Sequence, residues 1–274
     1  MKSLIVCADD FGLDLTVNEA VEQAHRHGIL TSASLMIAAP AAADAVARAR
    51  RMPELRVGLH LVLVDGIPLL PPEQIGSLVR CDGRFDRNMV RAAIRFAVLP
   101  QARRQLALEI ATQFAAFRAT GLRLDHVNAH KHLHVHPTVA RLTIEIGRDF
   151  GMKAVRVPSE PIAVLRAACP GERYRAPLYR PWIAQLRRRL QAAGLFVNDH
   201  LFGLAWTGSM REEKLLGLLA HLPDGISEIY CHPAIRRGED ELAALLSPRV
   251  KNLISMLGIR PIGYSDLLSL RNEM

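Results

Sequence analysis

The sequence has few aromatic residues, few cysteines and no long apolar run. Aromatic side chains make up 5% of its 274 residues, and no two of its four cysteines form a CxxC pair. This spacing indicates neither a disulfide framework nor a cysteine-based zinc site. Because no stretch of about 18 apolar residues occurs, a membrane-spanning helix is not expected either. Half of the residues are hydrophobic, which favours a globular protein with a large core.

The cysteines and the first residues bear on cellular location. Cys7 and Cys231 lie in apolar runs, so we expect both to be buried, unpaired thiols, as in a reducing cytoplasm. The first residues do not resemble a secretory signal, because their apolar stretch is short and ends in two acids. We therefore expect a cytoplasmic protein, which could still touch the inner membrane peripherally.

Basic residues outnumber acidic ones. The chain carries 35 Lys and Arg against 27 Asp and Glu, which gives a formal net charge of +8. Such an excess can attract nucleic acid, anionic lipid or an acidic substrate, or it can form a solvated surface without a dedicated partner. No nucleic-acid-binding signature accompanies it, so we expect no nucleic-acid partner. The sequence does not indicate an oligomeric state.

Short β-rich runs alternate with longer helical runs, a pattern typical of a parallel sheet covered by helices. We predict one catalytic α/β domain over residues 1–274, a distorted (β/α) barrel of about seven strands. A doubly wound open sheet is the alternative. The predicted strands are 4–8, 32–37, 55–62, 154–157, 226–231 and 259–262, with extended chain at 124–135. The predicted helices are 16–27, 41–52, 103–120, 137–150, 239–257 and one from 265, with a loop at 65–84 and a helical, basic insertion at 160–210.

Polar residues follow several of these strands at the point where each strand ends. Asp9 and Asp10 follow the first strand, His60 lies in the third, and His232 follows a late one. A histidine-rich segment covers residues 126–136. Because the carboxyl ends of parallel strands meet at one edge of the sheet, we expect these groups to gather there.

The adjacent Asp9 and Asp10 are unfavourable for folding alone. Like charges repel, and carboxylates are costly to bury without a cation or hydrogen bonds. One of them could cap the following helix, but a cap needs only one acid. If a metal ion is present, one Asp can bind it and the other can act as a general base on the activated water.

The histidine-rich segment is the strongest signal in the chain, because five of the eleven histidines lie between residues 126 and 136. In extended chain, alternation would place His130, His132, His134 and His136 on one side. We expect one or two of them to bind metal and the others to orient ligands or contact substrate. The alternative is a polar hydrogen-bonded cluster, or an exposed edge without function. Taken alone, His60 would be interpreted as a buried core residue. The histidine-rich segment and the paired acids support a ligand role for it.

One carboxylate and two imidazoles with open coordination positions fit several ions. Hydrolytic Zn²⁺, non-haem iron, and Mg²⁺ with waters all remain candidates. The second Asp favours hydrolysis, because it supplies a base beside the ion. His232 could act as a general acid, since imidazole ordinarily titrates near neutral pH, or it could be a turn residue. Arg156, at the end of a strand, could hold a substrate oxygen, polarise a carboxylate or form an ordinary surface salt bridge.

The segment 173–190 combines arginines with Tyr and Trp. Trp182, Ile183, Leu186 and Leu190 would share one face of a helix that arginines flank. Such a helix can lie on an anionic membrane, cover an amphiphilic substrate, or be an ordinary surface helix.

Together these motifs resemble the YdjC/ChbG family of carbohydrate deacetylases. Their order and spacing agree over nearly the whole chain, and the agreement is weakest at residues 160–210. The histidine-rich run looks most similar to the hopanoid-biosynthesis-associated (HpnK) subgroup, which is thought to act on an N-acetylglucosaminyl hopanoid. The segments that carry the resemblance are Ala8–Gly12, Gly58–Leu61, 126–136 and Tyr230–Pro233.

The resemblance implies a barrel of the NodB-like deacetylase type with a divalent metal, Zn²⁺ or Mg²⁺. By position in the motifs, Asp10, His60 and His130 take the ligand roles. Asp9 takes the base role and His232 the acid role in removing an N-acetyl group from an amino-sugar or glycolipid. Substrate contacts are assigned to His132, His134, Arg156 and Asn128.

Asn128 departs from the family pattern, which commonly has an Asp two residues before the first motif histidine. An amide cannot supply negative charge, so we expect Asp125 to take over such a role through a shifted contact. Three other functions remain open beside a lipid-linked substrate. They are a chitooligosaccharide deacetylase, a non-haem metal oxygenase or lyase with the same ligands, and a non-catalytic sugar-binding or metal-storage protein.

Overall fold

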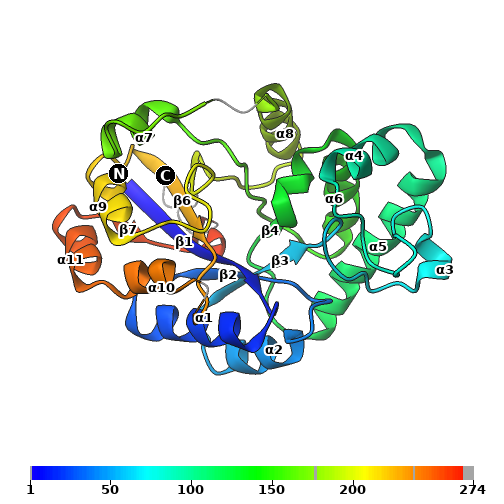
Figure 1. The fold of residues 1–274 in the computed structure, drawn as a ribbon, viewed down its shortest axis with the longest axis horizontal. Helices are drawn as coiled ribbons and strands as arrows, with labels where there is room; N and C mark the ends of the chain where they lie inside the picture. The colour runs from blue at the N-terminus through cyan, green and yellow to red at the C-terminus, as the bar shows by residue number, and fades with distance from the viewer. Residues whose placement is uncertain (1, 176–177, 237, 268–274) are drawn as a thin grey trace.

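The computed structural model describes residues 2–175, 178–236 and 238–267, which form a curved parallel sheet surrounded by helices (Figure 1). The seven-stranded sheet has the order β4-β3-β2-β1-β6-β5, and β7 also pairs with β1. Its named strands all pair in parallel. The strands are β1 (Lys2–Phe11), β2 (Ser32–Leu35), β3 (Arg56–Leu61), β4 (Val127–Ala129), β5 (His200–Phe202), β6 (Gly225–Cys231) and β7 (Arg260–Pro261).

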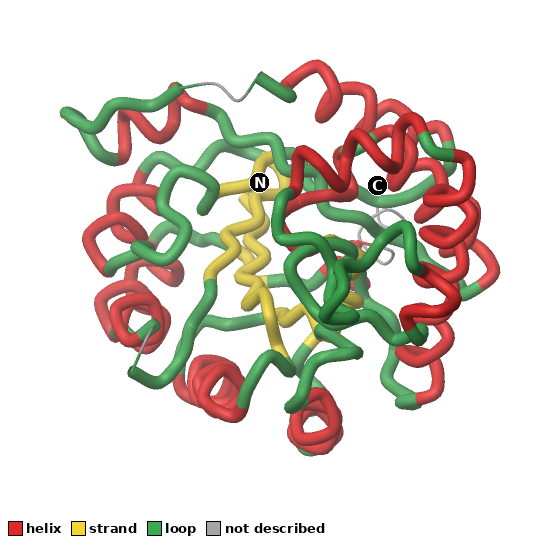
Figure 2. The backbone as a smooth tube through the Cα atoms, turned by 45° about the vertical axis from the view of Figure 1, so that its right-hand side comes forward, coloured by secondary structure: helices red, strands yellow, loops and turns green. Residues whose placement is uncertain are grey.

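Backbone hydrogen bonds connect the two edge strands of the sheet, β4 and β5, through the segment between them. Val127 in β4 donates to the carbonyl of Ala154, and Leu201 in β5 donates to that of Ser159. The segment 154–157, predicted as a strand, therefore lies between β4 and β5 as irregular parallel pairing with isolated bridges. The predicted α/β fold, a distorted barrel with helices outside, is confirmed (Figure 2).

Helices cover the outside of the sheet. The α-helices are α1 (Leu15–His27), α2 (Ala42–Arg50), α3 (Pro72–Ile75), α4 (Met89–Val98), α5 (Pro100–Ala119), α6 (Pro137–Asp149), α7 (Ile162–Ala168), α8 (Arg180–Ala192), α9 (Glu212–Ala220), α10 (Glu239–Leu246) and α11 (Pro248–Met256). Two 3-10 segments are η1 (His130–Val135) and η2 (Tyr264–Asp266).

β1 lies at the centre of the sheet because its apolar run is buried by neighbours on both sides. It pairs with β2 on one edge and with β6 on the other. Cys7 in β1 and Cys231 in β6 are both buried, unpaired thiols, as predicted. Immediately after β1, Asp14 accepts hydrogen bonds from two backbone N–H groups and so starts α1.

The histidine-rich segment is not extended, and here the prediction is wrong. β4 ends at Ala129, and the chain then turns into η1, in which Lys131 and His132 both have φ of +54°. Two successive left-handed residues redirect the backbone, so strict alternation along 130–136 does not apply. The histidines of this segment consequently point in different directions rather than to one side.

Other differences concern helix ends and elements that were not predicted. The predicted helix 239–257 is two helices, because Ser247 ends α10 and caps α11, whose first residue is Pro248. The predicted loop 65–84 contains the short α3, and neither α4 nor β5 was predicted. Residues 160–210 contain α7, α8 and β5. Most of the helix predicted from Ser265 lies outside the described residues.

Among the described helices, none has the combination of length and apolar character that a bilayer crossing requires.

The cap at Ser247 can be tested by Ser247→Ala. The serine side chain accepts hydrogen bonds from the backbone of Arg249 and Val250, so its loss should lower the free energy of unfolding by about 1 kcal/mol. Urea denaturation of the two proteins measures this difference. Ser255→Ala, at an exposed position inside α11, is the matched control and should change stability by less than about 0.5 kcal/mol. Equal effects of the two substitutions would contradict the assigned cap.

Candidate metal centre

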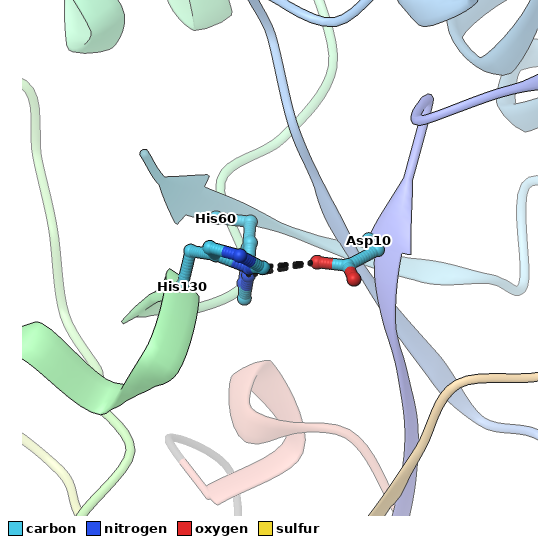
Figure 3. Close-up of side chains that lie close together, drawn as sticks. All are labelled: Asp10, His60 and His130. Carbon is cyan, nitrogen blue, oxygen red and sulfur yellow. Dashed lines mark hydrogen bonds and ion pairs between the residues drawn. The ribbon is translucent and has the colours of Figure 1, made fainter. Parts of the chain in front are cut away.

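Three side chains from separate elements converge at the carboxyl edge of the sheet (Figure 3). Asp10 comes from the end of β1, His60 from β3 and His130 from the start of η1. Asp10 Oδ1 lies 3.2 Å from both His60 Nε2 and His130 Nδ1, and these two nitrogens lie 3.4 Å apart. Of the residues that the structure describes, these three form the one His/Cys/Asp/Glu group close enough to hold a metal ion.

The backbone of β1 explains how Asp10 reaches this position. Its φ is +61°, and the register between β1 and β2 shifts between Ala8 and Phe11. Asp tolerates the left-handed region better than most residues, and a bulge of this kind changes the direction of a side chain. The two adjacent acids therefore do not follow the simple alternation of a strand.

The triangle of ligand atoms has the size that a metal ion requires. Tetrahedral Zn²⁺ with bonds of about 2.0–2.1 Å places its ligand atoms about 3.3 Å apart, close to the 3.2 and 3.4 Å found here. The side chains of Asp10 and His130 are 14% and 17% exposed, whereas that of His60 is buried. An ion held here would therefore be open to solvent on the side of Asp10 and His130.

The electrostatics of the triangle keep Asp10 ionised. Burial favours its neutral form, but hydrogen bonds from His130 and His60 outweigh burial and hold the pKa of Asp10 well below its usual range. Burial also favours neutral His60, but the carboxylates of Asp10 and Asp9 raise the pKa of His60. Positive charge between these side chains is thus stabilised by the protein.

Asn128 fixes His60 from behind. His60 Nδ1 lies 2.6 Å from Asn128 Oδ1 and 3.1 Å from Ser34 Oγ. With Nε2 as the ligand atom, Nδ1 carries the proton and donates it to the amide oxygen. Asn128 Nδ2 in turn donates to Asp9 Oδ1 at 3.1 Å. The Asn128 amide therefore accepts a hydrogen bond from His60 and donates one to Asp9. An ionised carboxylate at this position could not donate to Asp9.

Asp125, expected to replace the missing acid, does not contact His60. Its carboxylate accepts hydrogen bonds from His126 Nδ1 at 2.8 Å and from the backbone N–H of Ser265 at 2.7 Å. The expectation of a shifted contact is wrong, because Asp125 precedes β4 and its carboxylate binds His126 and the backbone of Ser265 instead.

Asp9 lies deeper than Asp10 and is 2% exposed. Arg156 donates to both of its oxygens, from Nη1 to Oδ2 at 2.6 Å and from Nη2 to Oδ1 at 2.8 Å. Ser34 Oγ donates to Oδ1 at 2.9 Å. Burial opposes ionisation, but the Arg156 charge holds the pKa of Asp9 well below its ordinary value. Asp9 is therefore a fixed carboxylate beside the triangle.

Sequence reasoning missed the second partner of Arg156, which is Glu228. Arg156 Nη2 donates to Glu228 Oε1 at 2.7 Å, and Tyr264 Oη donates to Glu228 Oε2 at 2.6 Å. Glu228, Arg156 and Tyr264 are all fully buried. A charged residue inside the apolar strand 226–231 was the available signal, because buried charges are retained in pairs.

Two further predicted residues, His232 and His132, lie around Tyr230 at the end of β6. The Tyr230 ring makes edge contacts with His132 and His232, with centroid separations of 5.0 and 5.5 Å. The charge of His232 contributes to the lowered pKa of Asp9. Burial holds the pKa of His132 well below its ordinary range, so its ring is neutral. His232 and His132 thus lie on one side of the candidate centre.

The structure gives Arg156, Asn128 and His134, predicted as substrate contacts, other neighbours. Arg156 and Asn128 are fully buried and hold Asp9 as described above. His134 is 1% exposed, and its Nε2 donates to the carbonyl of Arg156 at 2.9 Å. Burial lowers the pKa of His134 to about 3, so it is neutral. None of the three presents surface to a substrate in this structure.

Comparisons with known proteins agree in family and fold. A protein family described as "YdjC-like protein" matches residues 3–256. Proteins named carbohydrate deacetylase from Geobacillus stearothermophilus and Brevibacillus brevis are 30% and 26% identical, over 97% and 96% of this chain and 98% and 99% of theirs. A solved structure from Enterococcus faecalis V583, described as a candidate cellobiose-phosphate cleavage protein, has a TM-score of 0.76 at 23% identity. It covers 97% of this chain and 98% of its own.

The role of Asn128 can be tested by Asn128→Leu and Asn128→Asp. Leucine removes the acceptor that orients His60, so Zn²⁺ affinity should fall about 10–100-fold. Aspartate keeps that acceptor and should lose much less affinity. Zn²⁺ competition titrations against a chromophoric chelator measure both variants. Equal affinity of the Leu variant and the parent protein would contradict the role assigned to Asn128.

The buried ion network can be tested by Arg156→Met. The substitution leaves two buried carboxylates without their cation, so the free energy of unfolding should fall by about 3–5 kcal/mol. Arg141→Met is the matched control, because Arg141 pairs with Glu145 at a half-exposed surface position; its effect should stay below about 1 kcal/mol. Denaturant unfolding compares the two. A loss for Arg156→Met as small as the control's would refute the network's structural importance.

Proposed function

The chain belongs to the family of YdjC-like proteins, and from this premise we propose that it is a metal-dependent hydrolase that removes the N-acetyl group from an N-acetylglucosamine-type sugar. Relatives named carbohydrate deacetylase support sugar deacetylation. The observation that carries the metal-dependent mechanism is the Asp10, His60 and His130 triangle with the second carboxylate of Asp9 beside it.

Charge balance supports a divalent ion. Asp9, Asp10 and Glu228 bring three negative charges when ionised, and Arg156 brings one positive charge. One divalent cation would neutralise the remainder, which is otherwise costly in a buried site. Two imidazole ligands and the spacing of the ligand atoms favour Zn²⁺ over Mg²⁺, which prefers oxygen ligands and shorter ligand separations.

Asp9 is proposed as the general base. A bound divalent ion would act as a Lewis acid toward the acetamide carbonyl and would lower the pKa of water. Within the described part of the chain, Asp9 Oδ2 accepts one hydrogen bond, from Arg156, while Oδ1 accepts from Ser34, Asn128 and Arg156. Oδ2 therefore keeps acceptor capacity for the proton of the attacking water. Glu228 shares the Arg156 charge, so Asp9 is not fully neutralised.

His232 is proposed as the general acid that protonates the departing sugar amine. It follows β6, which pairs with β1 on the edge opposite to β2, so it lies on the other side of β1 from His60. Its backbone N–H donates to Glu241 Oε2 at 2.5 Å, which fixes the turn that carries it. His132 is proposed to contact the substrate, because its Nδ1 is buried without a hydrogen-bond partner in the described residues.

For the substrate, we propose an N-acetylglucosaminyl lipid of the hopanoid type. Leu178 and Trp182 are 99% and 50% exposed beside several arginines. An apolar, basic surface of this kind suits an amphiphilic substrate or peripheral contact with a membrane. The alternative is a soluble chitooligosaccharide, which needs no such surface. An oxygenase would use the same three ligands, but the buried base beside them favours hydrolysis.

The base role can be tested by Asp9→Asn. Removal of the proton acceptor should lower kcat by about 10²–10⁴-fold, while Zn²⁺ stays bound because Asp10, His60 and His130 are intact. Acetate release and metal content measure the two effects, and circular dichroism checks the fold. Asp10→Asn is the comparison and should lose metal. An Asp9→Asn protein with unchanged turnover would refute the base role.

The substrate class can be tested by offering the zinc-loaded protein an N-acetylglucosaminyl lipid and, separately, N,N′-diacetylchitobiose. Acetate release from the lipid alone is expected. Release from chitobiose alone would replace the lipid proposal with a chitooligosaccharide activity. Dependence of any turnover on O₂ would contradict hydrolysis.

A further inference from the structure

We propose that the exposed face of α4 is a docking surface for an anionic lipid bilayer. Val90, Ile94 and Val98 follow one another at four-residue spacing on this helix and are 65%, 57% and 60% exposed. Met89 and Leu99, at its two ends, are 39% and 44% exposed. These five side chains form what we call the α4 stripe, an apolar surface that runs the length of the helix.

Folding of the protein does not require the α4 stripe. α4 is held by its opposite face, where Ala92 and Phe96 are 3% and 1% exposed. Asn88 caps its first turn by accepting from the N–H of Arg91. An amphipathic helix that already buries one apolar face normally presents polar residues on the other. The second apolar face therefore needs a partner outside the described chain, since contiguous exposed apolar surface marks interaction sites.

The charge around the α4 stripe identifies the partner as anionic. Residues 87–108 contain five arginines and no Asp or Glu. Arg91 and Arg95 border the stripe and also pair with Asp86, whose side chain is 1% exposed and offsets one of their charges. Arg87 is 72% exposed and lies 3.8 Å from Asp65, and Arg104 is also exposed. An apolar stripe bordered by arginines matches the acyl region and the anionic headgroups of a bilayer.

The same charges argue against a second copy of the chain as the partner. A symmetric dimer would place each α4 stripe against its own equivalent. The arginines that border the stripe would then face the same arginines of the partner, and like charges opposed across a buried surface are unfavourable. A bilayer containing phosphatidylglycerol presents the opposite charge, and it also accepts a helix that lies flat in the interface.

α4 is connected to the segment that carries His130. The ring of Phe96 makes an edge contact with that of His136, at a centroid distance of 6.2 Å. Asp65, which accepts a hydrogen bond from Lys131 Nζ at 2.5 Å, also donates its backbone N–H to Asp86, just before α4. Figure 1 shows α4 on the outside of the molecule, over α5 and α6. These contacts connect the buried face of α4, and the segment just before it, to the segment that carries His130.

The experiment measures co-sedimentation of the full chain with sucrose-loaded vesicles of phosphatidylcholine, with and without phosphatidylglycerol, and needs no substrate. We expect binding to the anionic vesicles that weakens with salt. Val90→Gln/Ile94→Gln/Val98→Gln should lower the partition coefficient at least about tenfold. Arg87→Gln/Arg104→Gln leaves the stripe intact and should reduce both affinity and salt dependence. Met256→Gln, at an 82% exposed position on α11, is the matched control and should bind like the parent.

Three results would overturn the proposal. The first is no preference of the parent protein for anionic vesicles. The second is that Leu178→Gln/Trp182→Gln loses vesicle binding while the α4 triple variant binds like the parent protein. That result would assign docking to the surface around α8. The third is a parent dimer that the triple variant converts to a monomer in sedimentation velocity without lipid, which would assign the α4 stripe to self-association. None of these results bears on the deacetylase activity, which is measured separately by acetate release.

Discussion

The fully buried guanidinium of Arg156 is the constraint on which the rest of the site depends. It comes from the irregular segment between β4 and β5, and it holds Asp9 at the end of β1 and Glu228 in β6. Burial of a lone charge is costly, so each of these groups is tolerable only in the presence of the others. Arg156 thereby fixes the carboxylate of Asp9, while the next residue, Asp10, is held by its own contacts with His60 and His130. Together with Asp10, the ionised network would carry a net negative charge that a bound divalent ion would offset.

The parallel sheet brings residues that are far apart in the sequence together at one candidate centre. Asp10, His60 and His130 lie at the carboxyl ends of β1, β3 and β4, which are brought together by the order β4-β3-β2-β1. Ser34, at the end of β2, sits between them and contacts both Asp9 and His60. Asn128 accepts a hydrogen bond from His60 Nδ1 and so orients the ring whose Nε2 faces Asp10 and His130. The chemistry therefore depends on strand register as much as on the ligands themselves.

Features that depend on local sequence patterns could be predicted, whereas contacts between residues far apart in the sequence could not. Most strands and several helices with clear periodicity were predicted. Parallel topology predicted that the two acids, His60 and the histidine-rich segment gather at one edge, whereas the choice of Asp10, His60 and His130 as ligands came from the family resemblance. The turn at Lys131 and His132 was missed because two left-handed residues leave no periodic signal. The contact of Asn128 with Asp9 and that of Arg156 with Glu228 were not predicted, because each pair is far apart in sequence. The boundary at Ser247 and Pro248 was readable, since serine before proline is a helix-start signal, and so was the apolar spacing of α4.

The most direct test of the account is to locate zinc in crystals by anomalous scattering at the zinc edge. The account predicts one strong peak per chain, about 2.0–2.2 Å from Asp10 Oδ1, His60 Nε2 and His130 Nδ1. Asp9 should remain outside the coordination shell and paired with Arg156. A zinc peak at other residues, or no ordered zinc between these three atoms in zinc-loaded crystals, would contradict it.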